Sequence, residues 1–159
     1  LGLQNIKPLQ IIVPMSPRQT VIYDIIETQV LHDAERRDWI NALSDFAGFT
    51  WLIEVATDPA LLLKRNSYSQ QLVNIEGVDV ETIINEYYRY EEPTKLLAIK
   101  GLLQQDWFVR DREKVIIWCN YVSTMDKIAT MIDAEGYGER RLIYGATRDL
   151  REEYLDDFM

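Results

Sequence analysis

The feature that most constrains the fold of this chain is the order of apolar and polar segments over residues 114–158. An apolar run at 115–119 precedes a helical pattern at 123–135, a second apolar run at 141–144 and a further helical pattern from residue 148. The β-branched, non-alternating run at 115–119 is typical of a strand buried on both faces of a parallel sheet. Strand, helix and strand in about 30 residues form a βαβ unit. The end of the chain is therefore predicted to be α/β.

The preceding part of the chain predicts helices. Ser16 and Pro17 suit the N-cap and first position of a helix whose apolar residues recur every three or four positions. A second helix is predicted at about 34–55, ended by Asp58-Pro59. Further helices are predicted at about 80–90 and 94–105, with an exposed loop at 65–78. We divide the chain into a mostly helical region, 1–106, and the first half of a parallel-sheet domain, 107–159.

Composition excludes several classes of protein. The chain has 159 residues, one cysteine and one histidine, so neither a Cys/His zinc site nor a disulfide framework can form within it. No apolar run reaches the roughly 20 residues of a membrane helix, which predicts a soluble protein with no membrane partner, cytoplasmic or, in a eukaryote, nuclear. The net charge of −9 opposes autonomous DNA binding. The start at Leu1 and the end inside an amphipathic pattern suggest a piece of a larger protein.

Polar residues follow each predicted strand, at the edge where open parallel sheets place their ligands. The first set is Asn120, Ser123 and Thr124, and the second is Gly145, Thr147 and Arg148. Exposed N–H groups at a helix start attract phosphate. Capping of the following helix by Ser123 or Thr124 is an equally supported interpretation, and it is compatible with phosphate binding.

Several segments also resemble, in the same order, the Swi/Snf-like DNA translocases of helicase superfamily two. They are VPMSPRQTVIY at 13–23, LIEVATDPALLL at 52–63, PTKLLAIKGLL at 93–103, KVIIWCNY at 114–121 and the segment 144–158 with Gly145, Thr147, Arg151, Leu155 and Phe158. Two segments depart from the family pattern. Thr57-Asp58 stand where Asn/Ser-His is usual, and Trp118-Cys119-Asn120-Tyr121 stand where Phe-Ser-Gln-Tyr/Phe is usual.

The resemblance implies a helical inter-domain region followed by the first half of the second RecA-like, or helicase C-terminal, domain. It implies that the intact protein uses ATP and Mg²⁺ to move along duplex DNA, with the first RecA-like domain as a partner in cis. The loops after the two strands would then approach the DNA backbone, with Arg151 added as the family arginine; an internal ion pair is the alternative role of Arg151.

The nucleotide machinery itself is missing from the sequence. Neither a G-x-x-x-x-G-K-[ST] loop nor an Asp-Glu box after a β-prone run occurs. We therefore predict no ATP hydrolysis, no catalytic residue, no metal ligand and no cofactor for residues 1–159 alone.

The acidic charge favours a helical protein-interaction module without motor activity. A small-molecule-binding domain of flavodoxin-like type would need three or more further strands, which the sequence does not supply. An unfinished sheet would expose an apolar edge, which predicts self-association.

Overall fold

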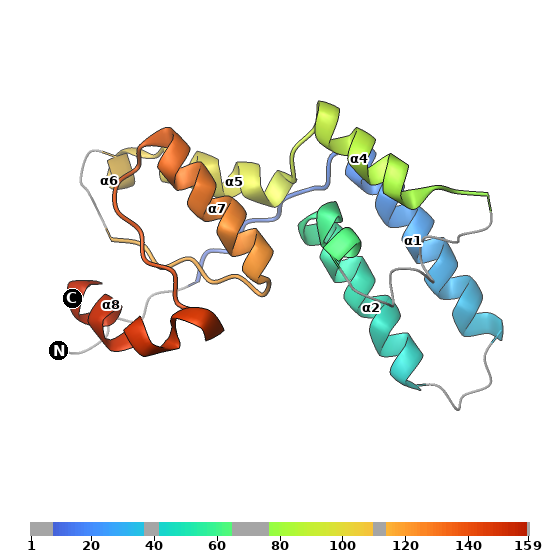
Figure 1. Cartoon of the computed structure of the whole chain (residues 1–159). Coiled ribbons are helices and arrows are strands. Elements are labelled where there is room, and N and C mark those ends of the chain that lie inside the picture. The colour runs from blue at the N-terminus through green and yellow to red at the C-terminus, as the bar shows by residue number, and fades with distance from the viewer. Residues whose placement is uncertain (1–7, 37–41, 65–76, 110–113, 159) are drawn as a thin grey trace.

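A computed structural model describes residues 8–36, 42–64, 77–109 and 114–158 (Figure 1). In these ranges the chain is helical, with no strand or sheet. Its elements are α1 (Pro17–Arg36), α2 (Ala42–Thr57), the 3₁₀ helix η2 (Pro59–Lys64), α4 (Val80–Tyr90), α5 (Thr94–Leu103), α6 (Asp106–Val109), α7 (Val122–Glu135), the 3₁₀ helix η3 (Gly145–Leu150) and α8 (Arg151–Phe158). The predicted α/β fold with a partial RecA-like parallel sheet is therefore wrong for the described residues.

Both predicted strands, 115–119 and 141–144, are non-helical segments that form no ladder with each other. Their side chains alternate in exposure: Val115 and Ile117 are half-buried, whereas Ile116 is 59% and Trp118 is 90% exposed. Two such short runs cannot form a stable sheet alone, because an isolated pair of strands is marginal in water and a parallel sheet needs cover on both faces. Strand propensity without that cover does not produce a sheet.

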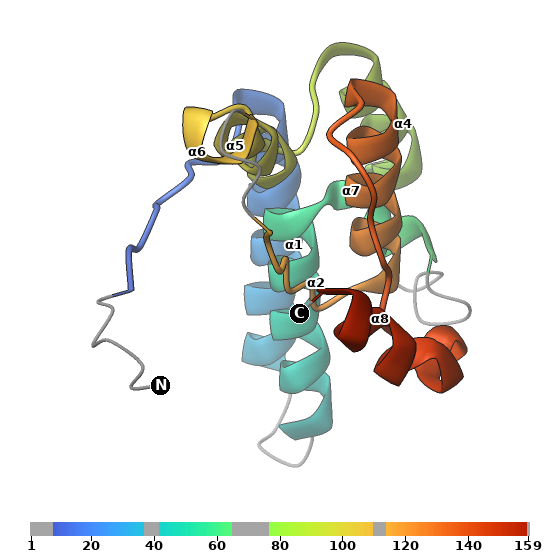
Figure 2. The same cartoon turned by 90° about the vertical axis from the view of Figure 1, so that its left-hand side faces the viewer.

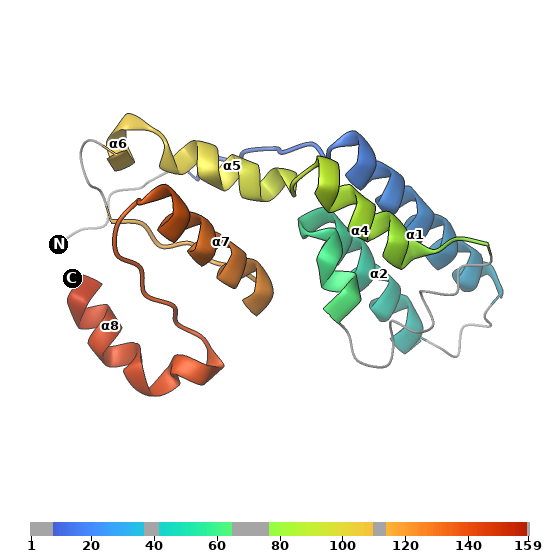
Figure 3. The same ribbon diagram turned by 45° about the horizontal axis from the view of Figure 1, so that its top comes forward.

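A helical bundle formed by α1, α2, η2 and α4 holds the main core. Figure 3 shows its three longer helices side by side. The buried residues of its apolar cluster are Ile22, Ile26, Val55, Leu62, Val80, Ile84 and Tyr87. The prediction that α1 begins at Pro17 is confirmed, and Ser16 Oγ accepts a hydrogen bond from the N–H of Gln19 at 3.4 Å. Gln19 is fully buried and donates its side-chain N–H to Val55 O of α2 at 2.8 Å.

The other bundle helices begin and end near residues that explain them. α2 stops at Thr57, directly before Asp58-Pro59 as predicted, and η2 follows. α4 spans 80–90 as predicted, and the carboxylate of Asp79 caps it by accepting from Thr82 N at 3.0 Å and from the Thr82 hydroxyl at 2.7 Å. The second helix was predicted to start at about residue 34, but residues 34–36 belong to α1, and α2 begins at Ala42. Residues 37–41 and most of the loop predicted at 65–78 lie outside the described residues.

A C-terminal lobe formed by α5, α6, α7, η3 and α8 lies to one side of the bundle (Figures 1 and 3). Its helix α7 matches the predicted 123–135 closely and ends at Gly136, whose positive φ of 69° suits glycine. The N-cap position of α5 is Pro93, and no side chain caps this helix. The boundary at residues 106/107 stays a prediction.

Candidate functional site

The first predicted set lies at the start of α7. Asn120 is exposed just before the helix, and Ser123 is half-buried in its first turn, where it lines a cleft of about 430 Å³ between α5 and α7. The Thr124 hydroxyl is buried and has no hydrogen-bond partner among the described residues. Neither Ser123 nor Thr124 caps α7, because the N-cap position is Tyr121 and no side chain serves there.

The second set lies in η3 and the start of α8. Thr147 holds the turn together: its hydroxyl donates to Leu142 O at 2.7 Å and accepts from the N–H of Tyr144 at 3.0 Å. Gly145, Arg148 and Arg151 are exposed. In the described part of the chain no carboxylate pairs with Arg148 or Arg151, whereas Arg141 contacts Glu139 and Asp157 at 3.3 Å each. The internal ion pair suggested for Arg151 is therefore not formed there.

The two sets lie at the same end of the C-terminal lobe. Segments 114–121 and 137–144 both run toward the end at which α7 begins, so the first turn of α7 and η3 come near each other in Figures 1 and 2. The chain path thus brings the sets to one region without a sheet. Two exposed guanidinium groups there can contact phosphate, although the neighbouring Glu152 and Glu153 oppose it. The nucleic-acid role of all seven residues stays a prediction.

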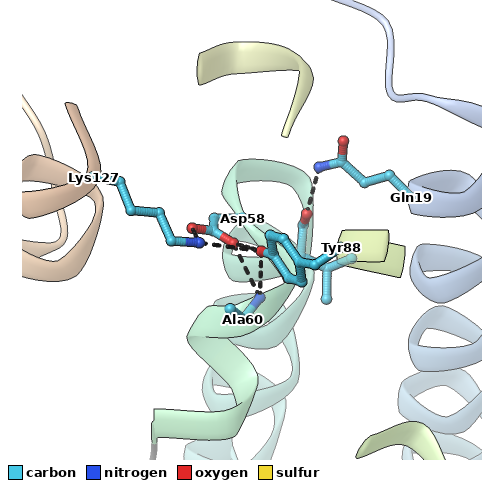
Figure 4. A network of polar contacts seen from close by, with 6 residues as sticks. Gln19, Asp58, Ala60, Tyr88 and Lys127 are labelled. Carbon is cyan, nitrogen blue, oxygen red and sulfur yellow. Dashed lines mark hydrogen bonds and ion pairs between the residues drawn. The ribbon is translucent and has the colours of Figure 1, made fainter. Parts of the chain in front are cut away.

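The most connected polar site among the described residues was not predicted. It centres on Asp58, which is 2% exposed, in the turn between α2 and η2. Its carboxylate accepts hydrogen bonds from the Tyr88 hydroxyl, from Lys127 Nζ at 2.5 Å and from the N–H of Ala60 at 3.1 Å. Figure 4 shows Lys127 reaching from α7 toward the pair formed by Asp58 and Tyr88.

The electrostatics of this cluster favour binding between protein segments over catalysis. Burial, followed by the hydrogen bond to Asp58, raises the pKa of Tyr88 above its ordinary value, so the phenol stays protonated and donates. The Lys127 ammonium lies 4.6 Å from the centre of the Tyr88 ring and 3.3 Å from its hydroxyl. The three donors to the carboxylate come from η2, α4 and α7, so the cluster joins three segments of the chain.

Sequence reasoning missed this cluster because its members lie in three distant segments. Asp58 was interpreted as part of a helix stop and as a departure from the family pattern, and no role was predicted for Lys127. Residues 58 and 127 are 69 positions apart, and nothing local links them. The sequence held one signal for this site: Asp58 is an acidic residue before a proline, at a position where the chain departs from the family pattern.

Metal sites and membrane-spanning helices are two further features that the described residues could contain. In the described ranges, no group of three or more His, Cys, Asp or Glu side chains is arranged to hold a metal ion. No helix within them is long and apolar enough to cross a membrane. Comparison with known proteins gave no match to a protein-family model, to a curated protein or to a solved structure.

Proposed function

We propose that this chain is a non-catalytic part of a Swi/Snf-like ATP-dependent DNA translocase. The observation that supports it best is that the two polar sets, implied by the resemblance to face the DNA backbone, lie at one end of the C-terminal lobe (Figure 2). The order of the resembling segments supports it further, since α1 begins within 13–23 and α5 within 93–103.

In this proposal the ATP and Mg²⁺ site belongs to another part of the translocase, the first motor domain, which binds this chain in cis. The C-terminal lobe contributes backbone contacts through Arg148 and Arg151, and the helical bundle separates the motor parts. With a net charge of −9, the chain alone binds duplex DNA weakly, because its overall field repels phosphate.

The test is fluorescence anisotropy of a short labelled duplex, titrated with the protein at a series of salt concentrations. We expect affinity to fall steeply with salt, and the double variant Arg148→Ala/Arg151→Ala to reduce the slope of log K against log salt by about 2, as expected for two lost phosphate contacts. Arg140→Ala is the matched control, because Arg140 is held by Asp133 at 2.5 Å.

Two results would count against the proposal. One is an absence of binding at the lowest salt concentration. The other is an equal loss of affinity in the control and in the double variant. ATP hydrolysis by purified residues 1–159 would contradict the separate prediction that the nucleotide machinery lies elsewhere.

A second candidate, an acidic module that docks onto protein, is favoured by the exposed apolar residues of the C-terminal lobe. Ile116, Trp118 and Val122 are 59%, 90% and 49% exposed, and aromatic residues are enriched in protein interfaces. The sheet edge from which self-association was predicted does not occur in the described residues, so a second copy of this chain is proposed as the occupant on these exposed apolar residues alone. Light scattering over a concentration series should show association that Trp118→Ser weakens; a strictly monomeric wild-type protein at high concentration would refute it.

A further inference from the structure

The bundle and the C-terminal lobe are connected by the short segment 91–93. Its first residue, Glu91, is held on α1 by the Ser16 hydroxyl, which donates to its carboxylate, and by Arg18 at 3.9 Å. Pro93 then adopts φ −55° and ψ 123°, so the chain is extended where α5 departs. The chain therefore has a firm anchor followed by a short pivot between the two parts.

Away from this pivot, the ion pairs of the described residues include one that joins the two parts. Among the described residues α7 packs closely against no other helix, either of the bundle or of the C-terminal lobe, and its Lys127 reaches Asp58 of the bundle at 2.5 Å. Two further polar contacts between described residues of the two parts, Thr94 to Gln19 at 3.4 Å and Lys95 to Thr57 at 3.5 Å, lie at the start of α5, beside the pivot. The contact between Lys127 and Asp58 lies away from the pivot, so of these contacts it has the largest effect on the orientation of the lobe.

The site that receives Lys127 remains hydrogen-bonded without it. Asp58 keeps two donors of its own bundle, the Tyr88 hydroxyl and the N–H of Ala60. The Asp58 side chain is 3% exposed, whereas that of Lys127 is 32% exposed. The ammonium can therefore withdraw into water while the buried carboxylate stays solvated by protein groups.

We infer that Lys127 and Asp58 form an electrostatic latch that closes the C-terminal lobe onto the helical bundle, with segment 91–93 as the hinge. Opening of the latch also changes the cleft between α5 and α7, because Lys64 of the bundle contributes to its wall together with Ser123 and Lys127. The latch needs neither DNA nor ATP, so it stands independently of the proposed function.

The test measures the distance between the two parts in solution. Spin labels at exposed Glu86 of α4 and exposed Glu139 after α7, in a Cys119→Ser background, report it by pulsed electron paramagnetic resonance. In Lys127→Met the ratio of open to closed molecules should rise about tenfold, which corresponds to about 1.4 kcal/mol. Lys127→Arg should keep the lobe closed, since it retains the charge.

Lys100→Met is the matched control. Lys100 pairs with Glu135 at 2.6 Å, but this contact joins α5 to α7 inside the C-terminal lobe, so its loss should leave the distance distribution unchanged. An unchanged distribution in Lys127→Met, or equal opening in the control, would overturn the latch. Loss of the helical circular dichroism of the bundle in Lys127→Met would also overturn it, because the Asp58 site would then depend on the lysine.

Discussion

The loss of stability on replacement of Trp118 by alanine distinguishes the observed fold from the predicted sheet. In the structure the side chain is 90% exposed, so about a tenth of the 150–250 Å² that a tryptophan can bury, roughly 20 Å², is removed from water. At about 25 cal/mol per Å² this contributes about 0.5 kcal/mol to folding. In a strand buried on both faces, the same substitution would cost about 3–5 kcal/mol.

The assay is urea unfolding followed by far-ultraviolet circular dichroism, which does not depend on the lost indole. Trp118→Ala should change the free energy of unfolding by no more than about 0.5 kcal/mol. Ile84→Ala is the matched control: Ile84 is 0% exposed in the core of the helical bundle, and its truncation should cost about 2–5 kcal/mol. A loss above about 2 kcal/mol for Trp118→Ala would refute the exposed position of this segment.

Two further substitutions probe the helical bundle. Burial raises the pKa of Tyr87 to about 12 from its ordinary 10, so the folded state keeps the phenolic proton where the unfolded chain loses it. The protonated Tyr87 phenol contributes about 1–3 kcal/mol to the free energy of unfolding, in full below pH 10, and this contribution is lost as pH rises toward 12. Tyr87→Phe should therefore flatten the fall in stability between pH 10 and 12. An equal fall in stability in both proteins would contradict this prediction. Gly48→Ala should cost about 1–3 kcal/mol in urea unfolding, because the added Cβ would lie 2.7 Å from a methyl of the stiff Val30 side chain; a stabilised variant would show that α1 and α2 are not in contact there.

The helical part of the fold could be predicted because its signals are local. Pro17 and the Asp58-Pro59 pair restrict the backbone, and Gly136 tolerates the positive φ at which α7 ends. The helices α1, α4 and α7 begin or end at such residues or within one residue of the predicted bounds. The apolar residues that recur every three or four positions in α1 include Ile22 and Ile26, which are buried, but also Val21, which is 54% exposed. Such features act over one or two turns and require no knowledge of the rest of the chain.

The prediction of a sheet was wrong because a strand, unlike a helix end, depends on contacts with distant parts of the chain. A run such as 115–119 indicates that a strand is favourable only if neighbouring strands and covering layers exist. The described residues supply α7 on one side and nothing that pairs with the backbone. The ion pair between Lys127 and Asp58 was missed for a related reason, since a contact across 69 residues follows from packing and not from any pattern within a helix.

The buried apolar residues are distributed very unevenly between the two parts of the molecule. The helical bundle holds the cluster around Ile84 and Tyr87, whereas the C-terminal lobe contributes Leu103, Ile128 and Ala129 to the buried apolar residues of the described ranges. Local opening requires less free energy where less apolar surface is buried. Backbone amides of α7 and α8 should therefore exchange with solvent deuterium by partial unfolding under native conditions, while those of α1 and α4 should exchange only by global unfolding.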